Sequence, residues 1–154
     1  MFFKIFIFLL LFIKSSYSHE LRPAIANLNI YEKDNIINAT LSIRLNLEAI
    51  IAEVNMDHSN TEESEKSGRY ESLRTMNADE LLKKFNSKIR DLQNKIYLTS
   101  DNSNYGLTLV DVDIPEVGNT DIIRDTVINF DIKNIKDEDL KFSWDKNLGS
   151  IILR

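Results

Sequence analysis

The clearest hydrophobic pattern in this chain is an alternation of apolar and polar residues over positions 37–47. Every second residue there is apolar, and Asn38, Thr40 and Arg44 are among the polar residues between them. Such alternation is typical of a β-strand with one face in a core and the other in solvent. A shorter alternation covers positions 26–31, and the polar residues 32–35 that separate the two stretches have the composition of a turn. The pattern therefore predicts an antiparallel hairpin.

The middle of the chain has the spacing of helices. Residues 48–54 form a short apolar-rich segment, residues 55–67 are polar and predict an exposed loop, and residues 69–76 carry an apolar side chain at every third position. Asn77 precedes Glu80 by three residues, which is typical of the first turn of a helix. An apolar stripe at helical spacing follows and predicts one amphipathic helix lying on a sheet. Its members are Leu81, Leu82, Phe85, Ile89, Leu92 and Ile96.

Strand patterns return after this helix and continue to the last residue. Turn signals separate the stretches about every ten residues, a spacing typical of β-sandwiches. We therefore expect a mainly β fold, an antiparallel β-sandwich of about seven strands with a helical insertion at about 48–95 between strands 2 and 3. The later strands are expected at residues 95–99, 107–114, 125–132, 140–144 and 150–153.

The first eighteen residues have the features of a secretory signal peptide. Lys4 supplies a positive charge, residues 5–13 are all apolar, and Ser16 and Ser18 place small residues at positions −3 and −1 of a cut before His19. The alternative, an uncleaved membrane anchor, is disfavoured because a spanning helix needs roughly 20 apolar residues. We expect a domain of residues 19–154 that is periplasmic or extracellular and has no membrane span after cleavage.

Composition narrows the range of partners. The formal net charge is −5, and it becomes −7 after cleavage because the signal peptide contains Lys4 and Lys14 and no acidic residue. An acidic domain without a basic run is a poor ligand for nucleic acid. The absence of cysteine excludes disulfides, zinc–thiolate sites and cysteine nucleophiles.

Signals for catalysis are few. The sequence contains two histidines and four glycines, and it has no Gly-x-Ser-x-Gly motif for a nucleophilic serine. Asp111 and Asp113 share one face of a predicted strand. A hydrolase could use two such carboxylates together in catalysis. Charged residues on strands more often form a solvent-exposed face. We therefore expect a protein without enzymatic activity.

A transition-metal site is the more specific chemical hypothesis. Cleavage before His19 would place an α-amino group, whose pKa is ordinarily about 7.7–8.0, and an imidazole on one residue. Adding the imidazole of His58 gives three nitrogen ligands, a set that suits copper or nickel. The second strand returns to the end where the first began, and eleven residues then lead to His58. Glu20, Asp57 or Glu62 could add an oxygen ligand. Alternatively, His58 is one polar residue of a solvated acidic loop, and no metal binds.

The segment His19-Glu20-Leu21-Arg22-Pro23-Ala24, directly after a signal peptide, resembles the extracytoplasmic N-terminal region of bacterial HupE/UreJ-like membrane proteins. Residues 46–52, 69–74, 114–120 and 144–154 are also similar to members of that group. The resemblance implies an accessory role in handling nickel or another transition metal. The transmembrane bundle of the longer members is not in this sequence, so transport itself is not implied.

Two functional hypotheses follow. In the first, the chain is an exported accessory domain that binds or delivers copper or nickel for a membrane metal permease, through His19, His58, Glu20 and Asp57. In the second, it is a non-catalytic interaction module of the cell envelope without a metal site. Its sheet face or its acidic loop would then dock an envelope protein.

Overall fold

The structure is a computed structural model that describes residues 21–54, 64–136 and 139–154. Of these residues, 41% are in strands and 25% in helices, which confirms the predicted mainly β class. The helices lie between the second and third strands in chain order, as expected. Within the described ranges, no helix is long and apolar enough to cross a membrane.

The larger sheet has five strands in the order β5-β6-β2-β1-β8. The predicted hairpin is its centre, because β1 and β2 pair antiparallel in one unbroken register from Ile25↔Arg44 to Lys33↔Ile36. Its two-residue turn, Asp34 and Asn35, has positive φ at both positions, the conformation that matches the twist of the flanking strands. The bounds are β1 Ala24–Lys33, β2 Ile36–Asn46, β5 Thr108–Asp113, β6 Asp125–Ile135 and β8 Ile151–Leu153.

The expectation of a purely antiparallel fold is wrong at the last strand. β8 pairs parallel to β1, with Ala24 opposite Ile151 and Ala26 opposite Leu153, so the five-stranded sheet is mixed. A 3₁₀ turn over Lys146–Leu148, followed by Gly149 at φ 83°, redirects the chain from the smaller sheet to the larger one. Because the chain crosses from one sheet to the other before β8, β8 can run parallel to β1. Strands joined by a short hairpin can only be antiparallel.

The smaller sheet is antiparallel and has the order β4-β3-β7. Its strands are β3 Ile96–Thr99, β4 Asn104–Tyr105 and β7 Lys141–Trp144. The two-residue strand β4 begins where the sequence predicted only a turn. The described residues therefore contain eight strands rather than the seven expected.

The described part of the insertion contains four helices: α2 Leu47–Ala52, α3 Ser67–Arg74, α4 Ala78–Asn86 and α5 Ile89–Gln93. Asn77 caps α4 as predicted, since its side chain accepts a hydrogen bond from the Glu80 amide at 2.9 Å. The single long helix predicted after Asn77 is wrong. The chain leaves the helix at Ser87 and Lys88, and Ile96 pairs with Trp144 in β3 instead of extending the apolar stripe. An apolar spacing of three and four residues is compatible with one long helix and also with two short helices followed by a strand. The pairing of Ile96 with Trp144 of β7 favours the second arrangement.

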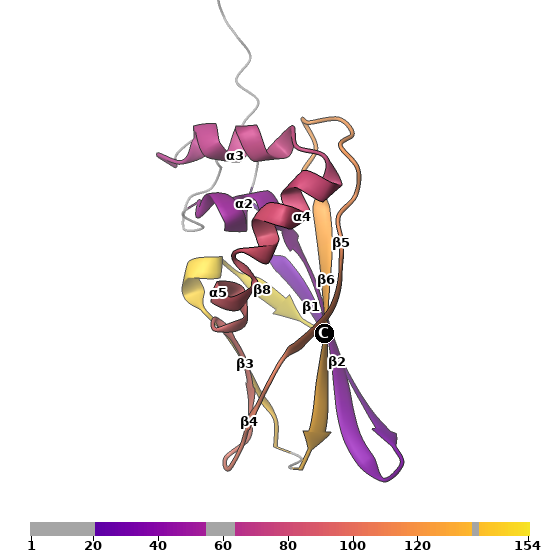
Figure 1. The fold of residues 1–154 in the computed structure, drawn as a ribbon. Helices are drawn as coiled ribbons and strands as arrows, with labels where there is room; N and C mark the ends of the chain where they lie inside the picture. The colour runs from indigo at the N-terminus through magenta and orange to yellow at the C-terminus, as the bar shows by residue number, and fades with distance from the viewer. Residues whose placement is uncertain (1–20, 55–63, 137–138) are drawn as a thin grey trace, which may run out of the picture.

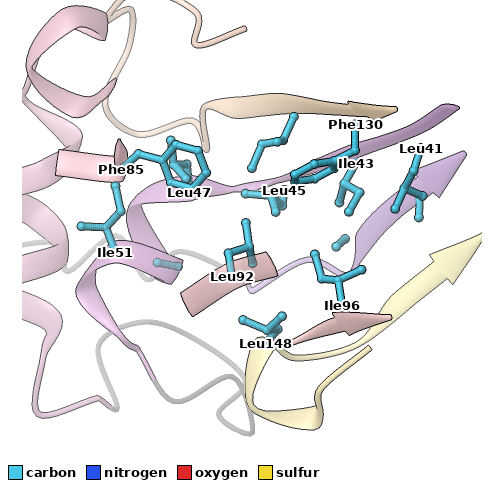
Figure 2. Close-up of a cluster of buried hydrophobic side chains, with 14 of the residues drawn as sticks. Leu41, Ile43, Leu45, Leu47, Ile51, Phe85, Leu92, Ile96, Phe130 and Leu148 are labelled. Carbon is cyan, nitrogen blue, oxygen red and sulfur yellow. The ribbon is translucent and has the colours of Figure 1, made fainter. Parts of the chain in front are cut away.

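The core lies between one face of the five-stranded sheet and a second layer made of the helices and the smaller sheet (Figure 1). Figure 2 shows Leu41, Ile43 and Phe130 on the larger sheet, with Ile96 and Leu148 across from them. Phe85 and Ile51 close the same cluster at its helical end. The other face of the five-stranded sheet has no layer over it among the described residues, and its side chains are mostly short and polar.

Candidate functional site

All four residues of the predicted metal site fall outside the described residues. His19 and Glu20 precede the first described residue, and Asp57 and His58 belong to the segment 55–63. Within the described ranges, no group of three or more His, Cys, Asp or Glu side chains is arranged to hold a metal ion. Because neither histidine of the chain is in those ranges, the copper or nickel site stays a prediction.

The carboxylates considered for hydrolysis lie on the uncovered face of the larger sheet. Asp111 and Asp113 are both exposed on β5, and the Asp111 carboxylate accepts a hydrogen bond from the Asn129 amide at 3.2 Å. Both side chains are exposed to solvent rather than enclosed in a pocket. Their position corresponds to the solvent-exposed strand face.

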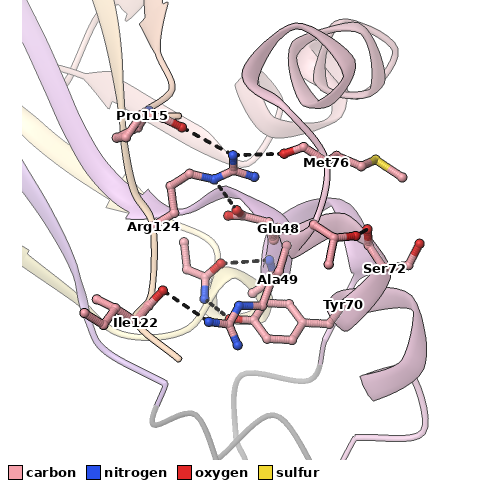
Figure 3. A network of polar contacts seen from close by, with 11 residues as sticks. Glu48, Ala49, Tyr70, Ser72, Met76, Pro115, Ile122 and Arg124 are labelled. Carbon is pink, nitrogen blue, oxygen red and sulfur yellow. Dashed lines mark hydrogen bonds and ion pairs between the residues drawn. The ribbon is translucent and has the colours of Figure 1, made fainter. Parts of the chain in front are cut away.

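Glu48 and Arg124 form the most deeply buried ion pair among the described residues. Arg124 Nε donates to Glu48 Oε1 at 2.7 Å, and the side chains are 8% and 2% exposed. Arg124 Nη1 also donates to the backbone carbonyls of Met76 and Pro115, at 3.1 and 3.3 Å (Figure 3). One guanidinium thereby joins α2, the α3–α4 junction and the segment that connects β5 to β6.

A second set of polar contacts extends this network toward α3. The Asn46 side chain accepts from the Ala49 amide at the start of α2 and donates to the Tyr70 hydroxyl at 2.8 Å. Arg74 stacks over the Tyr70 ring, 5.5 Å from its centre, and donates to the Ile122 carbonyl. Burial raises the pKa of Tyr70 above its ordinary value, so the phenol stays protonated at neutral pH. These contacts fix the insertion on the sheet, and we assign the network a structural role.

The feature of the described structure best suited to binding is the outer edge of β1. The Ala24 amide donates to Ser150 and the Leu28 amide donates to Arg154, so even-numbered amides of β1 point toward β8. Strand β8 ends at Leu153, so beyond Leu28 the edge of β1 has no strand partner among the described residues. No described residue pairs with the outward backbone groups of Ile30 and Glu32, so an added strand could bind there.

Apolar side chains flank this open edge on both faces of the sheet. Ile30 continues the core-facing row of Ala26 and Leu28 but is 50% exposed, since the second layer does not cover it. Tyr31, on the opposite face, is 39% exposed. Natural proteins usually protect long edges with charges, proline or bulges. Beyond Leu28, β1 has no proline and no bulge, and its only charged residues are Glu32 and Lys33 next to the turn.

A hollow of about 410 Å³ lies elsewhere, between α2, α5 and the 3₁₀ turn. Glu53 stands at its rim in the left-handed conformation, and its carboxylate contacts Lys88 at 2.6 Å and Lys66 at 3.1 Å. These two lysines lower the pKa of Glu53 to about 2. At this rim Glu53 already pairs with Lys88, and we assign the hollow no ligand.

Comparison with known proteins assigns no family: no family model, curated protein or solved structure matches the chain. The resemblance to HupE/UreJ-like proteins that begins at His19 therefore stays a prediction. The site at β1 was not identified from the sequence. The alternation of residues 26–31 indicates a strand, but only the length and pairing of β8 show which part of its edge is open.

Proposed function

We propose that the chain is a non-catalytic interaction domain of the cell envelope that receives an extended segment of another protein at the open edge of β1. The observation that supports this proposal is a combination of two features: outward backbone groups at Ile30 and Glu32 that no described residue pairs with, and exposed apolar side chains at Ile30 and Tyr31. Added strands obtain affinity from main-chain hydrogen bonds and specificity from alternate side chains. Location outside the cytoplasm is part of the proposal and depends on the signal peptide predicted for residues 1–18.

Amide hydrogen exchange tests the geometry of the edge first. Odd-numbered amides of β1, such as those of Asn29 and Tyr31, point toward β2, whereas those of Ile30 and Glu32 point outward. In the protein alone we expect Asn29 and Tyr31 to exchange slowly and Ile30 and Glu32 to exchange rapidly. Equal protection at all four amides would show that the edge is already covered and would overturn the proposal.

Photocrosslinking tests the binding itself. A photoreactive phenylalanine analogue replaces Tyr31, and in a second variant it replaces Tyr97, an aromatic residue of β3 with a similar exposure of 42%. In envelope extracts we expect a discrete adduct from position 31 that position 97 does not give, with the crosslinked peptide of the partner mapped to β1. The same adducts from both positions, or none from position 31, would contradict strand capture.

The variant Ile30→Pro gives this experiment its specificity control. Proline removes the outward amide of residue 30 without removing a hydrogen bond to β2, and it is tolerated on edge strands for this reason. Asn29→Pro removes an amide that faces β2 and is expected to destabilise the hairpin. Loss of the position-31 adduct in a folded Ile30→Pro protein is the expected result, and persistence of the adduct contradicts pairing at this edge.

A second candidate function is the binding of copper or nickel for a membrane metal permease, through His19 and His58. One observation favours it. The register places Ile25 opposite Arg44, so the start of β1 and the start of α2 lie at the same end of the sheet. Leu21 and Val54, the described residues nearest in sequence to the two histidines, are each within a few residues of that end. Calorimetric titration of copper(II) or nickel(II) into protein that begins at His19 tests this function.

We also infer that the two sheets form a β-sandwich whose second layer is completed by the helices. Inward side chains of both sheets belong to one hydrophobic cluster, Leu41 and Phe130 from the larger sheet and Leu98 from the smaller. Replacing Leu98 by Ala should therefore destabilise the whole domain, by about 2–5 kcal/mol. Loss of the smaller sheet alone in thermal unfolding would contradict a shared core.

A further inference from the structure

A second hollow lies on the uncovered face of the larger sheet, away from the open edge of β1. It has a volume of about 350 Å³, within the range of about 300–1,000 Å³ that is common for ligand sites. Strands β1, β2 and β8 contribute to its lining, and so does the segment that enters β6. Its lining includes three charged residues and three isoleucines: Arg22, Arg44, Asp125, Ile25, Ile123 and Ile152.

Two arginines in this hollow have no charged partner among the described residues. Arg22 and Arg44 are both exposed, and within the described ranges neither guanidinium forms an ion pair or a hydrogen bond. The pairing of Ile25 with Arg44 brings the start of β1 beside the end of β2, so Arg22 and Arg44 line the same hollow. Among the described residues of the lining, Asp125 contributes the only carboxylate, so these residues together carry a formal charge of +1.

The wall beside the arginines is apolar. Ile25 and Ile123 are half-buried, and Ile152 of β8 is 45% exposed. Ile152 pairs with Ile25 across β8 and β1, and Ile25 pairs with Arg44 across β1 and β2, which gives one row of side chains on this face. The row therefore presents apolar surface at one end and a guanidinium at the other.

We propose that this hollow binds the free C-terminal carboxylate of a peptide whose last residue is apolar. Guanidinium groups bind carboxylates through paired charge-assisted hydrogen bonds, which are stronger than neutral ones. The terminal side chain would lie against Ile25, Ile123 and Ile152. The Asp125 carboxylate would accept a hydrogen bond from a backbone amide of the same peptide. This inference does not depend on strand capture at β1, because it uses other residues.

Nuclear magnetic resonance titration with a defined peptide tests the inference. The probe is acetyl-Gly-Ser-Gly-Ser-Leu with a free carboxylate, and the matched control is the same peptide with a C-terminal amide. We expect saturable shifts at Ile25, Arg44 and Ile152 with the acid, and at least tenfold weaker binding of the amide. A peptide acid that ends in serine should also bind more weakly, since it lacks the apolar contact.

Two charge variants separate this site from general electrostatic attraction. Arg44→Gln should weaken binding of the leucine acid at least tenfold, whereas Arg90→Gln removes an exposed charge from α5 and should change it less than twofold. Arg44 is exposed, so unchanged urea unfolding midpoints are expected for both variants. Equal binding of acid and amide, no saturable shift, or displacement by equimolar inorganic phosphate would each overturn the proposal.

Discussion

Arg124 Nε lies 2.7 Å from Glu48 Oε1, and this ion pair joins two segments that are 76 residues apart in sequence. Burial of either charge alone is unfavourable, because a charge that leaves water without a partner loses its hydration. Further hydrogen bonds from Arg124 to the carbonyls of Met76 and Pro115 offset part of that loss. The pair therefore fixes how the helical insertion is oriented on the sheet.

Removal of one partner should be strongly destabilising. Arg124→Ala leaves the Glu48 carboxylate buried without a countercharge, and we expect the free energy of unfolding to fall by about 3–5 kcal/mol. Urea denaturation followed by circular dichroism measures this change. A decrease below about 1 kcal/mol would show that water reaches Glu48 in solution.

Apolar replacement of both partners is the matched control. Burying two leucines in place of an ion pair removes the desolvation penalty together with the attraction. The double variant Glu48→Leu/Arg124→Leu should therefore be more stable than Arg124→Ala, and the two single leucine variants should give non-additive effects. Additive effects in this cycle would mean that the two charges do not interact.

Asn46 and Asn77 allow a comparison of two helix caps, one buried and one exposed. Each asparagine accepts a hydrogen bond from the amide three residues later, but Asn46 also donates to the Tyr70 hydroxyl. Asn77→Ala should cost about 1 kcal/mol, a typical value for the loss of a cap. Asn46→Ala should cost about 1–3 kcal/mol more, because it removes a partner of a buried hydroxyl. Equal losses in thermal or urea unfolding would show that the contact with Tyr70 contributes nothing.

The sequence predicted local structure more completely than it predicted contacts between distant segments. Residues 37–47 alternate because one face of β2 is buried, and this periodicity is visible without a structure. The parallel pairing of β8 could not be read in this way, since an apolar strand has the same pattern in either direction. The role of Arg124 was also missed, because nothing near it in sequence shows that it reaches Glu48. The open edge of β1 is likewise defined by the partner strand that stops beside it.

Glu53 should make stability depend on pH in a narrow acidic window. Its pKa in the folded protein, about 2, is below the ordinary value of 4.5, so the stabilisation is complete above about pH 4.5 and is lost as pH falls toward 2. The carboxylate is half exposed, and exposed pairs contribute less than about 1 kcal/mol after solvent screening. Wild type and Glu53→Gln should therefore differ in urea midpoint at pH 6, and most of that difference should be lost by pH 2, where the carboxylate is about half protonated. A difference at pH 2 as large as that at pH 6 would rule out ionic pairing with Lys88 and Lys66 as its cause.

Export can be tested independently of any ligand. If residues 1–18 are a signal peptide, protein expressed with its own N-terminus in a bacterial host should be recovered outside the cytoplasm with His19 as its first residue. Intact mass and N-terminal sequencing measure this directly. Replacing Ser16 and Ser18 by bulky residues should block cleavage, because the peptidase requires small side chains at these positions. Cytoplasmic recovery of the uncleaved chain would contradict both the localisation and the amino-terminal metal site.

The metal hypothesis depends on an amino group that exists only if the chain begins at His19, and this gives it a sharp test. Copper(II) and nickel(II) are titrated by calorimetry into protein that starts at His19 and into a matched protein with one additional N-terminal alanine. The extra residue leaves both imidazoles in place but converts the α-amino nitrogen of His19 into an amide nitrogen, which is a poor ligand until it loses its proton.

We expect one-to-one binding that weakens at least tenfold with the added alanine and also with His58→Gln. Because the ligands must be deprotonated, affinity should fall as pH decreases from 8 to about 6. Equal binding by both proteins would remove the amino-terminal chelate from consideration, and strand capture at β1 would then be the remaining function.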